Sequence, residues 1–251
     1  MTAASGVRRL ILPAAAVAVI ILGAGLAFAL TGRPPASPHP AATATATVSP
    51  AAAAGPGSQG QSQVPRVSLA GVRWSSFYGV ELPVSAQAGP YDTSAGVAAG
   101  FAHTPLGALL AAVNIGVRAN AQWGPRIFTT VIRSQVTGPD AGALLAGCQA
   151  AYGQAAQSGG VTGGQPLGTA VVTEQAFRWI TYTPAAAILD LVSAGPGANG
   201  TTVRASVQME VVWDGDDWKV VAPPGGDWGN SAARLSSLAG YTAFPGQGGG
   251  R

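Results

Sequence analysis

Apolar and polar residues alternate between residues 203 and 213, and this run predicts a β-strand with one buried and one wetted face. Asp214-Gly215 follows directly and predicts a tight type I′ turn, because Asp-Gly accepts the positive φ that this turn requires. The partner strand is then expected at residues 217–221. The buried face is predicted to carry Val203, Ala205, Val207, Met209, Val211 and Trp213.

Two segments before this run, residues 170–182 and 185–194, are rich in β-branched and aromatic residues and predict further strands. Together with the hairpin they give three or four antiparallel strands in a meander. Residues 195–200 formally match the dinucleotide-binding pattern G-x-G-x-x-G. They join two predicted strands and no helix follows, so we interpret them as a hairpin loop.

A helix is predicted from Pro105 to about Arg118. Thr104 supplies an N-cap hydroxyl, and Pro105 occupies the first helical position, where a missing N–H is harmless. The apolar residues then recur at the helical period and form one stripe that should face the core. This stripe consists of Leu106, Leu109, Leu110, Val113 and Val117.

Two further helices are predicted, one after Gly124-Pro125 and one from Asp140 to the glycines at 159–164. A single strand is expected near residues 73–80, and a short helix near residues 231–238. Helices that precede a meander sheet indicate an α+β domain in which the helices cover one face of the sheet.

The N-terminal third predicts an anchor and a tether. Residues 10–32 carry no charge and are long enough to cross a bilayer as a helix. Arg8 and Arg9 precede this segment, so the positive-inside rule favours a cytoplasmic N-terminus and an exported C-terminal part. Residues 33–65 are rich in Ala, Pro and Thr and predict a disordered linker.

An alternative for this N-terminal segment is a cleaved secretory signal, because residues 27–29 have the small-x-small form of a cleavage site. The length of the apolar run favours a retained anchor. The predicted organisation is therefore a cytoplasmic tail (1–9), a transmembrane helix (10–32), a linker (33–65), an exported α+β domain (66–240) and a Gly-rich disordered tail (241–251).

Charge and composition argue against several kinds of binding site. The formal net charge is +3, but residues 66–251 hold nine Arg and one Lys against seven Asp and three Glu, so this part has no electrostatic footprint for nucleic acid. Cys148 is the one cysteine, which excludes an intramolecular disulfide. The two histidines lie far apart in the sequence and predict no zinc site. We expect no cofactor, no metal and no catalytic residues.

Several stretches carry a resemblance to known proteins. The helices followed by the hairpin VVWDGDDWKVV resemble the nuclear-transport-factor-2-like (cystatin-like) cone fold, in which helices pack on a curved antiparallel meander sheet. A more specific set resembles uncharacterised actinobacterial membrane proteins associated with conjugative elements, which are similar in plan to the bitopic inner-membrane subunit of type IV secretion channels. That set comprises Trp74, residues 79–85 with Pro83, Gly89-Pro90, and residues 100–107 with His103 and Pro105.

This resemblance implies a structural subunit of a conjugation or type IV-like secretion complex. We expect it in the plasma membrane as a single-pass protein, with other subunits or a second copy as partners. His103 is expected to fix the turn into the first helix or to join a surface patch, and Trp228 is expected to be peripheral. The alternative is an exported small-ligand-binding or isomerase-like enzyme with a pocket around Tyr182 and Asp190.

Overall fold

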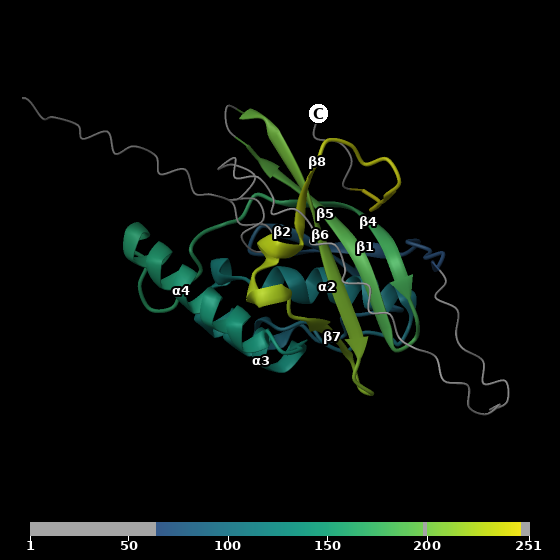
Figure 1. The fold of residues 1–251 in the computed structure, drawn as a ribbon, viewed down its shortest axis with the longest axis horizontal. Helices are drawn as coiled ribbons and strands as arrows, with labels where there is room; N and C mark the ends of the chain where they lie inside the picture. The colour runs from purple at the N-terminus through teal and green to yellow at the C-terminus, as the bar shows by residue number, and fades with distance from the viewer. Residues whose placement is uncertain (1–63, 198–199, 247–251) are drawn as a thin grey trace, which may run out of the picture.

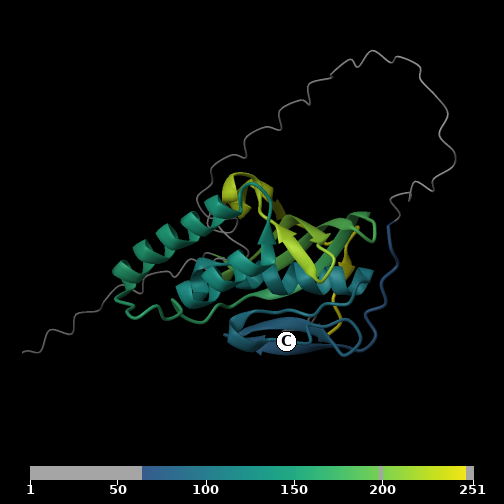
Figure 2. The same cartoon turned by 90° about the horizontal axis from the view of Figure 1, so that it is seen from below.

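A central helix lies between two β-layers in this α+β fold (Figure 1). A hairpin of β1 (Val72–Phe77) and β2 (Val80–Ser85) covers one side of helix α2 (Pro105–Arg118), and a seven-stranded sheet covers the other side (Figure 2). Because both sides are covered, α2 is buried continuously from Gly107 to Arg118. The predicted apolar stripe is thus part of a helix that is buried all round.

The computed structural model describes residues 64–197 and 200–246. The expected cytoplasmic tail, the membrane segment at 10–32, Arg8 and Arg9, and the linker as far as residue 63 lie outside these residues. Within the described ranges, no helix has the combination of length and apolar composition that a bilayer crossing requires.

The main sheet confirms the predicted meander. Its strand order is β3-β7-β6-β5-β4-β9, with β8 paired to β6. Strands β4 to β7 are consecutive antiparallel neighbours, whereas β3 is parallel to β7. The strands are β3 (Val136–Thr137), β4 (Thr173–Tyr182), β5 (Ala186–Pro196), β6 (Thr202–Trp213), β7 (Trp218–Val221), β8 (Ala232–Leu235) and β9 (Thr242–Ala243).

The three α-helices of the described residues begin where the sequence predicts. Thr104 Oγ1 accepts a hydrogen bond from the Gly107 N–H at 3.1 Å, which confirms the N-cap of α2. Gly160, in the left-handed conformation, ends α4. The other helices are α3 (Pro125–Gln135), α4 (Ala141–Gly159) and four short 3₁₀ turns, η1 (Ser94–Gly96), η2 (Ala121–Trp123), η4 (Pro224–Gly226) and η5 (Trp228–Ser231).

The single strand predicted at residues 73–80 covers most of β1, the turn at Tyr78-Gly79 and the first residue of β2. Phe77 pairs with Val80, and both turn residues have positive φ, 50° at Tyr78 and 89° at Gly79. That is the geometry of a type I′ turn, which usually carries Asn or Gly at its first position. Tyrosine at position 78 gave no turn signal, so the sequence interpretation ran one strand through the turn and did not predict β2.

The β6–β7 connection is longer than the predicted two-residue turn. Trp213 pairs with Trp218, so four residues form the loop. Asp214 Oδ1 accepts hydrogen bonds from the backbone N–H groups of Asp216 and Asp217 at 3.2 and 3.1 Å, and this side-chain turn replaces a type I′ turn. The loop predicted at 195–200 is confirmed only in part: β5 and β6 are antiparallel neighbours, but Gly195 and Pro196 still pair within this ladder, and residues 198–199 lie outside the described ranges.

Two predictions for the C-terminal region are wrong. The expected helix at 231–238 is η5 followed by β8, because Ala232 and its neighbours pair with β6 instead of forming local hydrogen bonds. The predicted disordered tail starts too early, since β9 pairs with β4 and Phe244 is only 4% exposed. The folded part therefore runs beyond residue 240.

Candidate functional site

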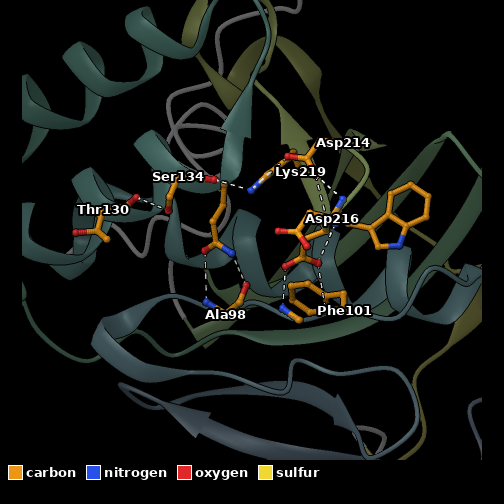
Figure 3. A network of polar contacts seen from close by, with 11 residues as sticks. Ala98, Phe101, Thr130, Ser134, Asp214, Asp216 and Lys219 are labelled. Atoms are coloured by element: carbon orange, nitrogen blue, oxygen red, sulfur yellow. Dashed lines mark hydrogen bonds and ion pairs between the residues drawn. The ribbon is translucent and has the colours of Figure 1, made fainter.

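The structure places the first part of the resemblance stretch 100–107, with residues 98–99 before it, against the β6–β7 hairpin at 213–219, which also contributes to the resemblance. We call this region, with the C-terminal end of α3, the hairpin junction (Figure 3). At its centre, the nearly buried Asp217 carboxylate accepts hydrogen bonds from the N–H groups of Gly100 at 2.7 Å, Phe101 at 3.0 Å and Trp218 at 2.8 Å. One side chain thus fixes the loop before α2 to the sheet.

Helix α3 is tied into the same junction. The Gln135 amide accepts from the Ala98 N–H and donates to the Ala98 carbonyl, as a backbone strand would (Figure 3). Lys219 Nζ donates to the Ser134 carbonyl at 2.8 Å and lies 3.6 Å from Asp214 Oδ2. The junction therefore links a loop, a helix end and a hairpin through side-chain to backbone contacts.

His103 lies on the exposed side of the junction. Its ring stacks on Trp213 with the centroids 4.0 Å apart and the planes 9° apart. Its Nε2 is 2.6 Å from the Pro184 carbonyl oxygen, and because a carbonyl can only accept, Nε2 carries the proton. The ring also meets the edge of Trp218, whose Nε1 donates to the Ala102 carbonyl at 3.0 Å. His103 therefore fixes the turn into α2 and is also part of the surface.

The loop beside this aromatic stack carries negative charge. Asp214 and Asp216 are exposed. The backbone N–H of Asp217 lowers the pKa of Asp214 below its usual value, so this carboxylate is ionised at neutral pH. An aromatic stack next to charged groups can bind a protein partner. The cluster of His103, Trp213, Asp214 and Asp216 does not pair a nucleophile with a base.

Asp190 and Tyr182, the residues of the predicted pocket, do not converge. Asp190 Oδ2 lies 2.5 Å from Arg178 Nη2 on the face of the sheet opposite α2, with the Tyr241 hydroxyl 3.4 Å away. Tyr182 is paired with Ala187 and packs against the core on the other face. The Asp190 carboxylate is therefore paired with Arg178 and does not face Tyr182.

Glu174 is a functional candidate that the sequence interpretation missed. It lies on β4 and is 0% exposed. Its Oε2 accepts from Ser193 Oγ at 2.7 Å, while its Oε1 has no hydrogen-bond partner. Burial raises the pKa of this carboxyl to about 7. A charged residue inside the β-branched and aromatic run at 170–182 was the available signal, although the run alone does not say which face Glu174 occupies.

Arg118, at the end of α2, is the second buried ionisable group that was missed. It is 4% exposed, and its Nη1 donates to the backbone and side-chain oxygens of Asn114 at 3.1 and 2.7 Å. Its guanidinium lies 4.3 Å above the Phe77 ring. Burial lowers the pKa of Arg118 to about 10, so it stays charged at neutral pH. These contacts join α2 to the β1–β2 hairpin.

The other residues that carry the sequence resemblance lie at or near the contacts between α2, the β1–β2 hairpin and the C-terminal segment. Trp74 Nε1 donates to the Pro245 carbonyl at 2.8 Å, and the Pro83 carbonyl accepts from Asn114 Nδ2 at 2.9 Å. Pro105 starts α2, and Pro90 precedes the loop that reaches the hairpin junction. Trp228 was expected to be peripheral, but this prediction is wrong because its side chain is 2% exposed.

No metal-binding cluster occurs among residues 64–197 and 200–246: they hold no group of three His, Cys, Asp or Glu side chains in suitable positions. Cys148 is buried on α4, and burial raises the pKa of its thiol to about 11. A shallow hollow where β8 separates from β6 includes Arg204 and Arg234. Their register partners place these two side chains on opposite faces of the sheet, so they do not form a joint anion site.

Residues 35–243 match a family described as a domain of unknown function (DUF8175). This chain belongs to that family. The DUF8175 match includes the whole hairpin junction, Glu174 and β9, together with most of the predicted linker. No curated protein and no solved structure matches the chain.

Proposed function

We propose that this DUF8175 protein is a membrane-anchored assembly subunit of a conjugation or type IV-like secretion complex. Its α+β domain then acts outside the cytoplasm through protein-protein contacts. The uncharged segment at 10–32 behind Arg8 and Arg9, followed by an Ala- and Pro-rich linker, supports this single-pass arrangement.

The hairpin junction is the observation that carries the proposal. The motif at 100–105 and the aromatic hairpin, which both contribute to the resemblance, form one surface through Asp217 and the His103–Trp213 stack. A surface whose loops are already fixed loses little conformational entropy when a partner binds. Aromatic side chains also anchor many protein interfaces. These properties suit a docking surface for a neighbouring subunit.

The arrangement of helices on a meander also supports the finer proposal of a cone-shaped, nuclear-transport-factor-2-like domain. Helices α2 to α4 precede strands β4 to β7, as in that plan. The β1–β2 hairpin on the far side of α2 is an addition to it. In such a subunit, membrane anchoring raises the local concentration of the domain, so weak lateral contacts suffice.

One observation favours a second candidate, an exported small-ligand-binding or isomerase-like enzyme. Glu174 is a carboxyl whose pKa lies near neutrality in an apolar environment, which is the property that a general acid or base needs. This role would require a route for a ligand to Glu174, not to Asp190 or Tyr182.

The proposal is tested by mild solubilisation of the native membrane fraction that contains the tagged full-length protein. We expect an intact N-terminus by mass and co-purification of channel subunits or a conjugation ATPase. His103→Ala should reduce that recovery by at least about tenfold if the stack is an interface anchor. Gln208→Ala, an exposed change on β6, is the matched control. A soluble mature chain that starts near residue 30 and purifies alone would overturn the proposal and favour the enzyme.

A further inference from the structure

The last described residues, 236–246, form a strap across the sheet. The strap leaves β8 at one side of the sheet and reaches the free side of β4 (Figure 1). There β9 pairs with β4 through only two residue pairs, Ala176 with Ala243 and Phe177 with Thr242. The strap is therefore held by a short antiparallel ladder at an edge of the sheet.

Beyond this ladder, the strap fills a specific slot. Phe244 donates its N–H to the Gln175 carbonyl at 2.9 Å, and its ring packs 5.3 Å from Phe177 and 5.8 Å from Trp74. The Trp74 indole N–H then bonds the Pro245 carbonyl. The slot thus recognises an extended segment by its backbone and by one aromatic side chain, and it joins β1 to β4.

The edge of β4 continues past the strap. Strand β4 runs to Tyr182, but among the described residues no strand pairs with the outer side of residues 178–182. Continuation of the β9 register would place Tyr241 opposite Arg178 and Gly240 opposite Trp179. The Tyr241 ring already lies 4.7 Å from the Arg178 guanidinium. A bulge after Trp179 would end such pairing there.

Within one chain, the strap leaves this edge unpaired. It arrives from β8, which pairs with β6, and must cross β5 to reach β4. Tyr241 therefore rests on the Arg178–Asp190 ion pair, and Gly240, with φ +82°, turns the chain toward the crossing. A strap that came from another molecule would not have to make this crossing.

We infer that the slot on β4 also accepts the strap of a second copy of this chain, so that neighbouring subunits exchange their C-terminal strands. The exchanged strand can keep the contacts of Ala243, Phe244 and Pro245, and it gives up only the turn at Gly240 and Tyr241, so exchange costs little. It can also pair with Arg178 and Trp179, which doubles the ladder from two pairs to four. This inference deepens the proposed assembly function and rests on it for the high local concentration at a membrane.

Disulfide trapping between two full-length chains tests the exchange. Ala176→Cys is introduced into one chain and Ala243→Cys into another, both with Cys148→Ala, and the two are mixed in detergent and oxidised. Directly opposed antiparallel residues have Cα atoms about 4.5–5.5 Å apart, which suits a disulfide. We expect a cross-linked heterodimer. Adding Phe244→Ala to the second chain should reduce its yield at least about tenfold, because the ring that fills the slot is lost.

A chain with Ile180→Cys, exposed on β4 but outside the ladder, replaces the Ala176→Cys chain as the control for random collision. Equal cross-linking with this control would overturn the exchange. An Ala176→Cys/Ala243→Cys double variant that closes within one chain, while the mixture gives no heterodimer, would also overturn it. Failure of that internal closure would overturn the register itself. Each result is separate from co-purification of other subunits, which tests the proposed function.

Discussion

Asp217 and Glu174 are both buried carboxyl groups, but they lie in different surroundings. Asp217 accepts three backbone N–H bonds at the hairpin junction, whereas Glu174 accepts one hydroxyl bond and leaves Oε1 without a partner. Glu174 directly precedes Gln175, the residue that holds the strap. The hairpin junction is therefore fixed by three hydrogen bonds to one carboxylate, whereas the strap is held by a two-pair ladder next to a carboxyl that has one hydrogen bond.

The largest effect is expected at the junction. Asp217→Ala leaves the N–H groups of Gly100, Phe101 and Trp218 without their acceptor in a nearly buried site. Each such loss costs about 1–3 kcal/mol, so we expect the free energy of unfolding to fall by about 4 kcal/mol in urea titrations.

Asp216→Ala is the matched control for this variant. Asp216 lies one residue away in the same loop but is exposed, so its removal should change stability by less than about 0.5 kcal/mol. If both variants lost the same stability, the effect would come from loop charge and not from the three hydrogen bonds.

A somewhat smaller, pH-dependent effect is expected at Glu174. The folded state holds the proton up to about pH 7, whereas an unfolded glutamate releases it near pH 4.5. The contribution of Glu174 to stability is therefore fully present below pH 4.5 and is lost as the pH rises to about 7. Since a tenfold change in proton affinity is worth about 1.4 kcal/mol, the decline should reach about 3 kcal/mol.

Glu174→Gln sharpens this prediction, because the amide can still accept from Ser193 but cannot ionise. Urea titrations between pH 4 and pH 8 should show a flatter profile for this variant than for the native chain. Glu210→Gln, exposed on β6, should keep the native profile. A native profile that is already flat would contradict the assignment of Glu174 as a buried neutral acid.

Compared with the changes at Asp217 and Glu174, His103→Ala should have a small effect on stability. The variant loses the stack on Trp213 and the hydrogen bond to Pro184, but the site is exposed. We expect a loss of about 1 kcal/mol in the same titrations. A loss above about 3 kcal/mol would make His103 a core residue and would weaken its use as a test of partner binding.

Local signals predicted a large part of the fold. Thr104-Pro105 marks the start of α2 because capping chemistry depends on neighbouring residues. The alternation in β6 predicts its buried Val207, Met209 and Val211 in the same way. At the site, the sequence predicted that His103 helps to fix the turn into α2. Its stacking on Trp213 could not be predicted, because the two residues lie in stretches far apart in the sequence.

The predictions that failed depend on contacts between distant residues. Helix α2 is buried on all faces only because β2 lies across it, with Asn114 bonded to Pro83. Trp228 appeared peripheral among glycines, and Phe244 appeared to lie in a disordered tail, yet tertiary packing buries both. The position of Glu174 inside the core likewise depends on which face of β4 the helices cover.

Hydrogen exchange on the full-length chain tests most directly whether the strap opens locally while the hairpin junction stays closed. The amides of Gly100, Phe101 and Trp218 should exchange only through global unfolding, because their acceptor is nearly buried. The amide of Phe244 should exchange at least about tenfold faster, through local opening of the two-pair ladder. Equal protection of Phe244 and Gly100 would contradict the account.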